Sequence, residues 1–236
     1  MTVLLVVMTF VLFILADYLV GLYRAGREEG VSAGVALREG ELAVAPALAG
    51  APPVEPVWVA GYQLPEELTY HRGHTWARAL GPDTVLVGLD DFARKLLGPV
   101  RGMTLPKVGS WLRQGGKGFG VQVNGRTADL VAPVDGEVIE INPALARQPS
   151  LISDDPYGRG WVMKVRSSDV ARVMQNMLSG SLAHKWMEDS RERLELQLMA
   201  LSGSVLQDGG EPVADFALHL ENDDWQQLIH EFLLTP

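Results

Sequence analysis

The side chains best suited to chemistry in this sequence are two histidines and one lysine. His71 and His74 are close enough along the chain to share one metal ion, but no third metal ligand stands beside them. Lys117 is surrounded by glycines, yet their spacing fits neither the Walker motif nor the dinucleotide fingerprint, so a turn leading into a strand is the favoured interpretation. No serine stands in a nucleophile-elbow sequence. The sequence therefore predicts neither a catalytic site nor a metal site.

The composition excludes several classes of function. The chain has no cysteine, which excludes thiol catalysis, thiolate metal sites, disulfides and cysteine-ligated iron–sulfur clusters within it. Its formal net charge of -9 does not favour nucleic acid as a partner. With 47% hydrophobic and 21% charged residues, the chain can bury a sizeable core. We expect a folded protein that binds no nucleic acid.

Short strands separated by turns dominate residues 84–166. Strands are predicted at 84–89, 119–123, 127–132, 136–141 and 161–167. A short helix is predicted at 90–98, where Asp90 suits the N-cap and Gly98 the C-terminal end. Closely spaced short strands of this kind favour a small antiparallel sandwich or barrel.

One turn can be predicted in more detail than the others. Asn124-Gly125 separates the second and third predicted strands, and Asn-Gly is the strongest short hairpin signal. It suits a type I′ turn, in which both central residues have positive φ. We therefore expect a tight structural turn at this hairpin tip.

After residue 168 the pattern changes to helix. Amphipathic helices are predicted at 169–180 and 181–203, and a last helix is expected to be capped by Asn222 or Asp223. Together with the strands, these helices predict an α+β protein with a helical C-terminal extension.

Residues 2–23 are almost entirely apolar and predict a transmembrane helix. About 20 apolar residues are enough to cross a hydrocarbon core of roughly 30 Å. Asp17, the one formal charge, either reaches the headgroup layer or bonds to a neighbouring transmembrane helix. A secretory signal is the competing interpretation, but its basic start and cleavage site are not evident. We expect a transmembrane helix at 1–24 and an Ala/Pro-rich linker at 25–57.

The residues that flank the predicted span indicate its orientation. Arg24 and Arg27 follow the span directly, and nothing basic precedes it. The positive-inside tendency then places most of the chain in the cytoplasm. The sequence thus predicts a single-pass protein of the inner (cytoplasmic) membrane that contacts lipid through residues 3–23.

The order of several short motifs between residues 70 and 170 resembles the H protein of the glycine cleavage system, a relative of lipoyl domains. The matching motifs are Tyr70-x3-His74-x-Trp76, Val87-Gly88, Leu96-Leu97-Gly98, Leu105-Pro106-x-Val108-Gly109, Ala132-Pro133-Val134-x-Gly136-Glu137, Asn142-x-Ala144-Leu145 and Asp155-Pro156-Tyr157-x2-Gly160-Trp161. The resemblance implies a barrel-sandwich hybrid domain at 58–180, followed by a helical extension at 181–236. The expected fold is therefore an α+β barrel-sandwich hybrid of the lipoyl type, with an N-terminal transmembrane helix.

In the family, a lysine on a hairpin tip seven residues before the Ala-Pro-Val motif carries lipoate. Counting back from Ala132 gives Gly125, which has no amine for the amide bond. Arg126 cannot substitute, because a guanidinium is not a lipoylation acceptor. Lys117 is the alternative, although it precedes the outgoing strand instead of lying at the tip. The resemblance therefore implies a degenerate relative that has kept the carrier scaffold and lost the carried group.

These observations predict a non-catalytic accessory subunit of a membrane-bound complex, with respiratory or photosynthetic electron-transfer complexes as the expected hosts. The alternative is a membrane-tethered adaptor that recruits lipoyl-dependent or glycine-cleavage enzymes. We expect partner contacts at Asp17, Arg126, Trp186 and Trp225, although a core role is also open for the two tryptophans. The expected partners are other protein subunits and membrane lipid, and no cofactor is expected.

Overall fold

The computed structural model describes residues 55–202 and 220–234. All of them belong to the second of the two units into which the chain divides, residues 47–236. The predicted span at 2–23 and nearly all of the predicted linker at 25–57 lie outside the described residues.

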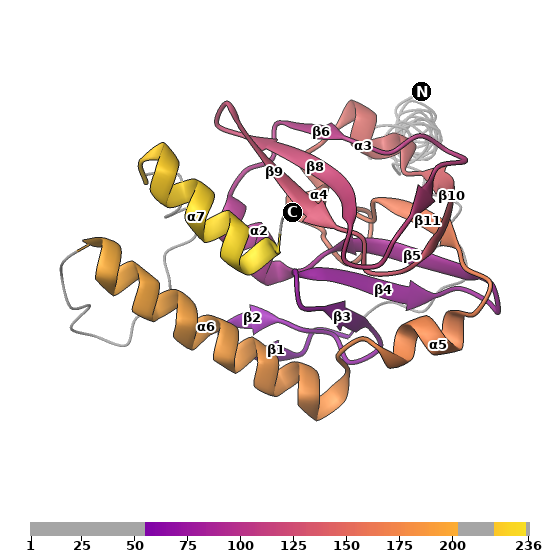
Figure 1. The fold of residues 1–236 in the computed structure, drawn as a ribbon, viewed down its shortest axis with the longest axis horizontal. Coiled ribbons are helices and arrows are strands. Elements are labelled where there is room, and N and C mark those ends of the chain that lie inside the picture. Colours follow the sequence, from indigo (N-terminus) through magenta and orange to yellow (C-terminus); the bar gives the residue numbers. More distant parts are fainter. Residues whose placement is uncertain (1–54, 203–219, 235–236) are drawn as a thin grey trace, which may run out of the picture. The chain divides into compact units, whose positions relative to one another are not determined.

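The described fold is built from antiparallel strands in three sheets (Figure 1). The strands are β1 (Trp58–Val59), β2 (Tyr62–Gln63), β3 (Thr69–His71), β4 (Thr75–Ala79), β5 (Thr84–Leu89), β6 (Gly102–Thr104), β7 (Trp111–Leu112), β8 (Lys117–Val123), β9 (Arg126–Val131), β10 (Gly136–Ile141) and β11 (Met163–Arg166). The largest sheet has the order β3-β4-β5-β11-β10-β7, the second has the order β6-β8-β9, and β1 pairs with β2.

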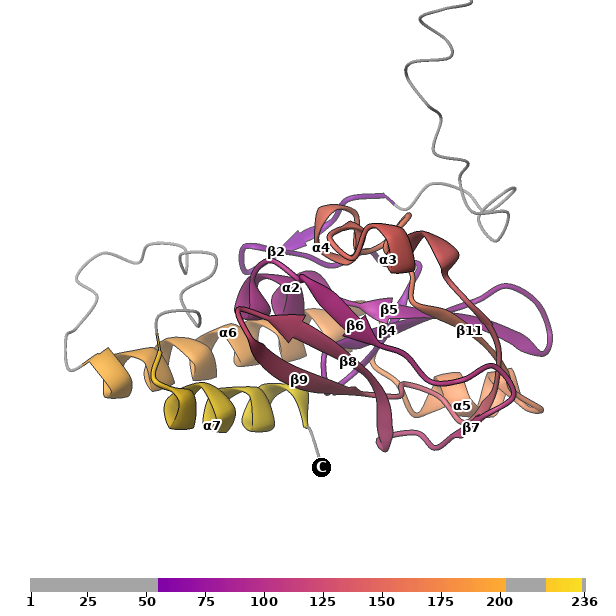
Figure 2. The same ribbon diagram turned by 90° about the horizontal axis from the view of Figure 1, so that it is seen from above.

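Short helices connect the strands, and two longer helices follow the last one. The helices are α2 (Asp91–Leu97), α3 (Pro143–Arg147), α4 (Leu151–Asp154), α5 (Val170–Gln175), α6 (Gly180–Ser202) and α7 (Asn222–Leu233). In Figures 1 and 2, α6 and α7 run side by side along one flank of the sheets. Side chains join the two helices, since Gln197 of α6 hydrogen-bonds to Glu231 of α7 and the Arg193 guanidinium lies 5.5 Å from the Phe232 ring centre.

The predicted α+β class with antiparallel strands is confirmed for the described residues. Strands cover the core with alternate side chains, as in β9, where Ala128 and Leu130 are buried while Thr127 is exposed. Trp76 and Trp161, two of the aromatic residues in the matching motifs, are fully buried. The core therefore lies between the large sheet and the three-stranded sheet.

Several local predictions are confirmed in detail. Strands β5 and β10 have the predicted bounds, 84–89 and 136–141. Helix α2 is capped by the Asp90 carboxylate, which accepts a hydrogen bond from the Ala93 amide at 2.8 Å, and it ends at Gly98. These elements form as predicted because their signals are local.

Two helix boundaries differ from the prediction. Helix α5 ends at Gln175 and does not continue to residue 180, because Leu178 leaves the helix to exchange two backbone hydrogen bonds of 2.8 Å with Tyr70. The last helix begins at Asn222 with Glu221 in the N-cap position, one residue earlier than expected. Pairing with a distant strand thus overrides the local helical pattern at α5.

The predicted inner-membrane localisation is corrected. Within residues 55–202 and 220–234, no helix is long and apolar enough to cross a membrane. Helix α6, with 23 residues, has the length, but charged side chains recur along it from Lys185 to Glu195. The described residues therefore give no support to the predicted single-pass topology or to the lipid contact predicted for residues 3–23.

Candidate functional site

The tip of the β8–β9 hairpin consists of Asn124 and Gly125, and its backbone has the predicted type I′ form. The φ angles are 48° at Asn124 and 77° at Gly125, and both residues are exposed. A Cβ atom built on Gly125 would meet no heavy atom within 4 Å. A side chain at this position would therefore project into open space, and only its backbone conformation would be strained.

Helix α7 holds the strand next to this tip. Arg126 donates a hydrogen bond from Nη2 to the carbonyl oxygen of Leu220, at 2.8 Å. Its guanidinium carbon lies 5.4 Å from the centre of the Trp225 ring, within the range of a cation–π contact. Of the predicted contact residues, Arg126 is therefore half-buried against α7 and Trp225 is fully buried in the chain's own core. Trp225 therefore has the core role that the sequence analysis left open.

Lys117 lies at the opposite end of the same hairpin. It pairs with Val131 across the ladder, whereas the tip follows the pair Val123 and Arg126. Its ammonium is 2.5 Å from the Asp129 carboxylate, and 57% of its side chain is exposed. The amine is thus accessible but engaged in an ion pair along the strand, away from the tip.

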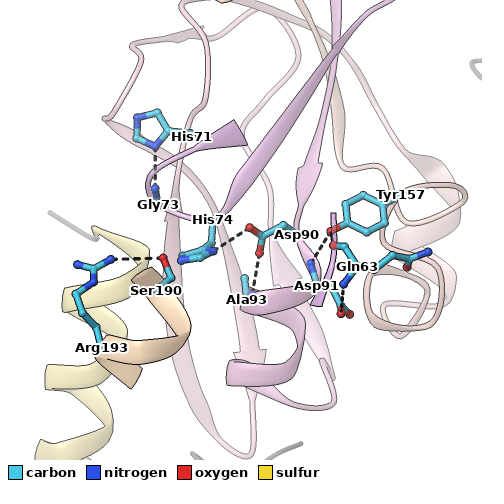
Figure 3. A network of polar contacts seen from close by, with 10 residues as sticks. All are labelled: Gln63, His71, Gly73, His74, Asp90, Asp91, Ala93, Tyr157, Ser190 and Arg193. Carbon is cyan, nitrogen blue, oxygen red and sulfur yellow. Dashed lines mark hydrogen bonds and ion pairs between the residues drawn. The ribbon is translucent and has the colours of Figure 1, made fainter. Parts of the chain in front are cut away.

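His74 and Asp90 form a buried polar pair beneath the C-terminal helices (Figure 3). His74 Nδ1 lies 2.8 Å from Asp90 Oδ2, and neither side chain has any exposed surface. The other Asp90 oxygen caps helix α2 through the Ala93 amide. His74 Nε2 is buried and has no hydrogen-bond partner among the described residues. His74 is also held at a positive φ of 58° in the turn between β3 and β4.

Two aromatic rings cover the faces of the His74 imidazole. The Phe92 ring from α2 stacks at 4.0 Å between ring centres, and the Trp186 ring from α6 stacks at 4.6 Å. Trp186 is half-buried, and its outer side lines a cavity of about 720 Å³ with Leu182 and Arg193 of the same helix. We call His74, Asp90, Phe92 and Trp186 the His74 cluster. The Trp186 ring covers His74 and also lines the cavity, so the partner contact predicted at Trp186 stays a prediction.

The second histidine has a separate structural role. His71 Nδ1 accepts a hydrogen bond of 3.1 Å from the Gly73 amide, which requires that nitrogen to be unprotonated. Burial lowers the pKa of His71, and the charges of His74 and Arg72 lower it further. In the described ranges there is no group of three or more His, Asp or Glu residues that could hold a metal ion. His71 and His74 therefore serve the β3–β4 turn and the core, each through a different partner.

A second network joins α2 to the strand layer. The buried Asp91 carboxylate accepts from the Gln63 amide, and the Tyr157 hydroxyl accepts from the Asp91 amide at 2.9 Å (Figure 3). The same carboxylate also accepts from Arg94. Burial, reinforced by Asp90, raises the pKa of Tyr157 well above its ordinary value. Tyr157 therefore stays neutral and donates to the Gln63 carbonyl oxygen. These contacts crosslink segments that are far apart in sequence.

Comparison with known proteins identifies the family. Residues 68–190, just over half of the chain, match the glycine cleavage H-protein family. A glycine cleavage system H protein of Magnetococcus marinus is 40% identical over 126 residues, which cover 53% of this chain and 88% of the relative. One from Mycobacterium avium is 44% identical over 111 residues, covering 47% of this chain and 83% of the relative. The chain belongs to the glycine cleavage H-protein family.

A solved structure is also similar to this chain. The crystal structure of a glycine cleavage system H protein from Mycobacterium marinum has 28% sequence identity and a TM-score of 0.47, and covers 54% of this chain and 98% of its own. The relatives named here are glycine cleavage system H proteins.

The matched range separates the candidate residues. His74, Asp90, Arg126 and Trp186 fall inside it, whereas Trp225 lies in the part of the chain beyond it. Asp17 lies outside the described residues. Sequence reasoning recognised Asp90 only as a helix cap and missed its bond to His74, because 16 residues separate the two. One signal was available in the sequence. An N-cap carboxylate uses one oxygen to cap the helix, and its second oxygen, when buried, needs another hydrogen-bond partner.

Proposed function

We propose that this chain is a lipoyl-free member of the H-protein family that acts through protein contacts, as a non-catalytic accessory subunit of a larger enzyme complex. The observation that supports this proposal is the hairpin tip, where Gly125 occupies the position at which the family resemblance implies the lipoyl lysine. Lipoate attachment forms an amide with a primary amine, and glycine offers none.

The surroundings of the tip also support a scaffold role. The neighbouring Arg126 is fastened to the Leu220 carbonyl and to the Trp225 ring. These contacts hold the strand beside the tip in place, which suits a surface for protein contacts. Helix α7 lies in the C-terminal extension that the family match does not cover, so this fastening belongs to the added part of the chain.

Family membership favours a specific second candidate. In this alternative the chain is an adaptor that recruits lipoyl-dependent or glycine-cleavage enzymes through the surface it shares with its relatives, which are named as glycine cleavage system H proteins. The matched range contains both fully buried family tryptophans, Trp76 and Trp161, so the scaffold that shapes such a surface is present.

The test is purification of the full-length tagged chain from its native cells, with intact-mass measurement and identification of the co-purifying proteins. We expect the unmodified mass and stoichiometric recovery with the subunits of one complex. Recovery with electron-transfer subunits would support the host class expected from the sequence, and recovery with lipoyl-dependent enzymes would support the adaptor.

A lipoyl mass increment would overturn the lipoyl-free proposal. Peptide mapping then decides where it sits, and a Lys117→Arg variant is the matched control, because it keeps a cation for Asp129 but removes the primary amine. Loss of the increment in that variant would identify Lys117 as a displaced carrier lysine.

A further inference from the structure

The outer edge of the largest sheet presents an exposed tryptophan. Strand β7 is the last strand in the order β3-β4-β5-β11-β10-β7, and no strand of the described residues pairs with its outer side. Trp111 in this strand is 65% exposed, and Val108 in the turn just before it is 60% exposed. Exposed edges pair readily with another extended chain, and large exposed apolar side chains mark interaction surfaces.

A hollow of about 340 Å³ lies beside Trp111. It is lined by Trp111, Asp135, Ser167, Ser168, Asp169, Arg172, Val173 and Asn176. Figure 2 shows β7 and α5 close together at the end of the molecule away from α7, so this surface is separate from the hairpin tip and the His74 cluster. The hollow and the strand edge together form one surface, which we call the β7 edge.

The two carboxylates in the hollow are oriented by backbone amides. Asp135 accepts from the Gln114 amide at 2.8 Å through Oδ1, and Asp169 accepts from the Arg172 amide at 3.0 Å through Oδ1. Both residues are exposed, so the second oxygen of each remains available to a ligand. Two acidic side chains against one arginine leave the hollow net acidic, and the whole chain carries a net charge of -9.

We propose that the β7 edge binds an extended, basic segment of a partner protein, which adds to β7 as the next strand. Every second side chain of an added strand points to the same face, so a lysine or arginine on the face of Trp111 can pack its aliphatic stem on the ring and place its charge in the hollow between Asp135 and Asp169. Backbone pairing contributes affinity, and the charge match selects basic segments. This inference identifies a surface through which the proposed function could make its protein contacts. It rests on the proposed function only because both require a protein partner.

A second exposed tryptophan provides the matched control. Trp58 is 64% exposed, nearly the same as Trp111, but the Lys95 ammonium lies 5.5 Å from the centre of its ring. It belongs to the two-stranded β1–β2 sheet, and the hollow at the β7 edge does not include it. Its loss removes a comparable exposed ring without touching the proposed surface.

The test is titration of the full-length chain with synthetic peptides, followed by calorimetry. The probe is a seven-residue peptide of alternating valine and lysine, and its acidic twin has glutamate in place of lysine. We expect the basic peptide to bind at least about tenfold more tightly than the acidic one. Trp111→Ala should weaken binding by about tenfold or more, whereas Trp58→Ala should change it by less than about twofold.

A second variant tests the charges without disturbing the fold. In Asp135→Asn with Asp169→Asn, both side-chain oxygens that accept the backbone amides are retained, and asparagine remains a good helix cap at 169. The double variant should lose about tenfold in affinity and most of the salt dependence.

Three results of the peptide titration would overturn the proposal. These are absence of binding by the basic peptide, equal binding of both peptides, or equal loss in Trp58→Ala and Trp111→Ala. A concentration-dependent dimer that Trp111→Ala abolishes would instead assign the surface to a second copy of the chain, and would also overturn it. None of these results alters the co-purification test of the proposed function, so the two failures are distinguishable.

Discussion

The hairpin tip and the His74 cluster are specified in opposite ways. The tip depends on two adjacent residues, Asn124 and Gly125, whose positive φ angles follow from their own conformational preferences. The His74 cluster needs side chains from the β3–β4 turn, from α2 and from α6 to meet around one imidazole. The tip thus forms from a local signal alone, whereas the His74 cluster forms only when the whole domain is folded. Substitutions should therefore cost far more in the cluster than at the tip.

The largest expected effect is from Asp90→Ala. This change removes the partner of His74 Nδ1 and the cap of α2 together, and we expect a loss of about 3 kcal/mol in unfolding free energy. Urea unfolding followed by circular dichroism measures it. Asp90→Asn is the control, because it keeps the capping oxygen and should lose less. A loss below about 1 kcal/mol for the alanine variant would contradict the importance of the pair.

Trp186→Ala should have the next largest effect. The ring is half-buried and stacks on His74, so its removal should destabilise the fold by about 2 kcal/mol. Trp186→Phe retains an aromatic face and should recover roughly half of that loss. Equal losses in both variants, measured by the same unfolding experiment, would show that stacking on His74 contributes nothing.

Gly125→Lys tests the tip and places an amine at the family position. The side chain has open space, but the φ of 77° should cost about 1–2 kcal/mol. Gly125→Asn should cost less, since asparagine tolerates this conformation. Coexpression with a lipoyl ligase and intact-mass analysis then shows whether the scaffold is accepted as a substrate. The exposed tip leaves a lysine at this position accessible, so we expect lipoylation if Gly125 is the lost carrier position, and absence of lipoylation would contradict a retained carrier scaffold.

Arg126→Ala should be milder. It removes the bond to the Leu220 carbonyl and the contact with the Trp225 ring, which together should contribute about 1 kcal/mol. Amide hydrogen exchange should accelerate in α7 and remain unchanged in β4 and β5. Arg126→Lys keeps the charge over the ring and serves as the control; uniform acceleration throughout the domain would refute a local fastening.

The smallest effect is a pH dependence from His71. Its folded-state pKa lies below the ordinary value of about 6.5, so the unfolded chain takes up a proton first as the pH falls. The stabilising contribution of His71 should therefore be fully present above about pH 6.5. It should decline below that pH, as the Gly73 hydrogen bond to Nδ1 is lost. His71→Asn keeps an acceptor and should flatten this part of the stability curve. An identical curve for both proteins would exclude His71 as the cause.

The same contrast explains what the sequence could predict. The Asn124-Gly125 turn, the Asp90 cap and the bounds of β5 follow from neighbouring residues, and all were predicted correctly. The end of α5 was not, because Leu178 pairs with Tyr70 from a distant strand. The His74–Asp90 bond and the covering of His74 by Trp186 depend on how segments far apart in sequence pack together. No periodicity within a short window contains that information.

Gly73 shows how closely the last helix approaches the β3–β4 turn. A Cβ atom there would lie 2.9 Å from the carbonyl oxygen of Leu233 and 2.5 Å from a Val131 methyl group, so the turn accepts no side chain once α7 is in place. Phe92 of α2 also packs against Phe232 of α7, with the rings tilted and their centres 5.3 Å apart.

These contacts join residues that are made at very different moments on the ribosome. At about 5–20 residues per second, about 7 to 28 seconds pass between synthesis of Phe92 and of Phe232. During that interval the nascent domain exposes the apolar surface that α7 will later cover. The protein is thus expected to engage holding chaperones during translation and to complete its fold only after α7 has emerged.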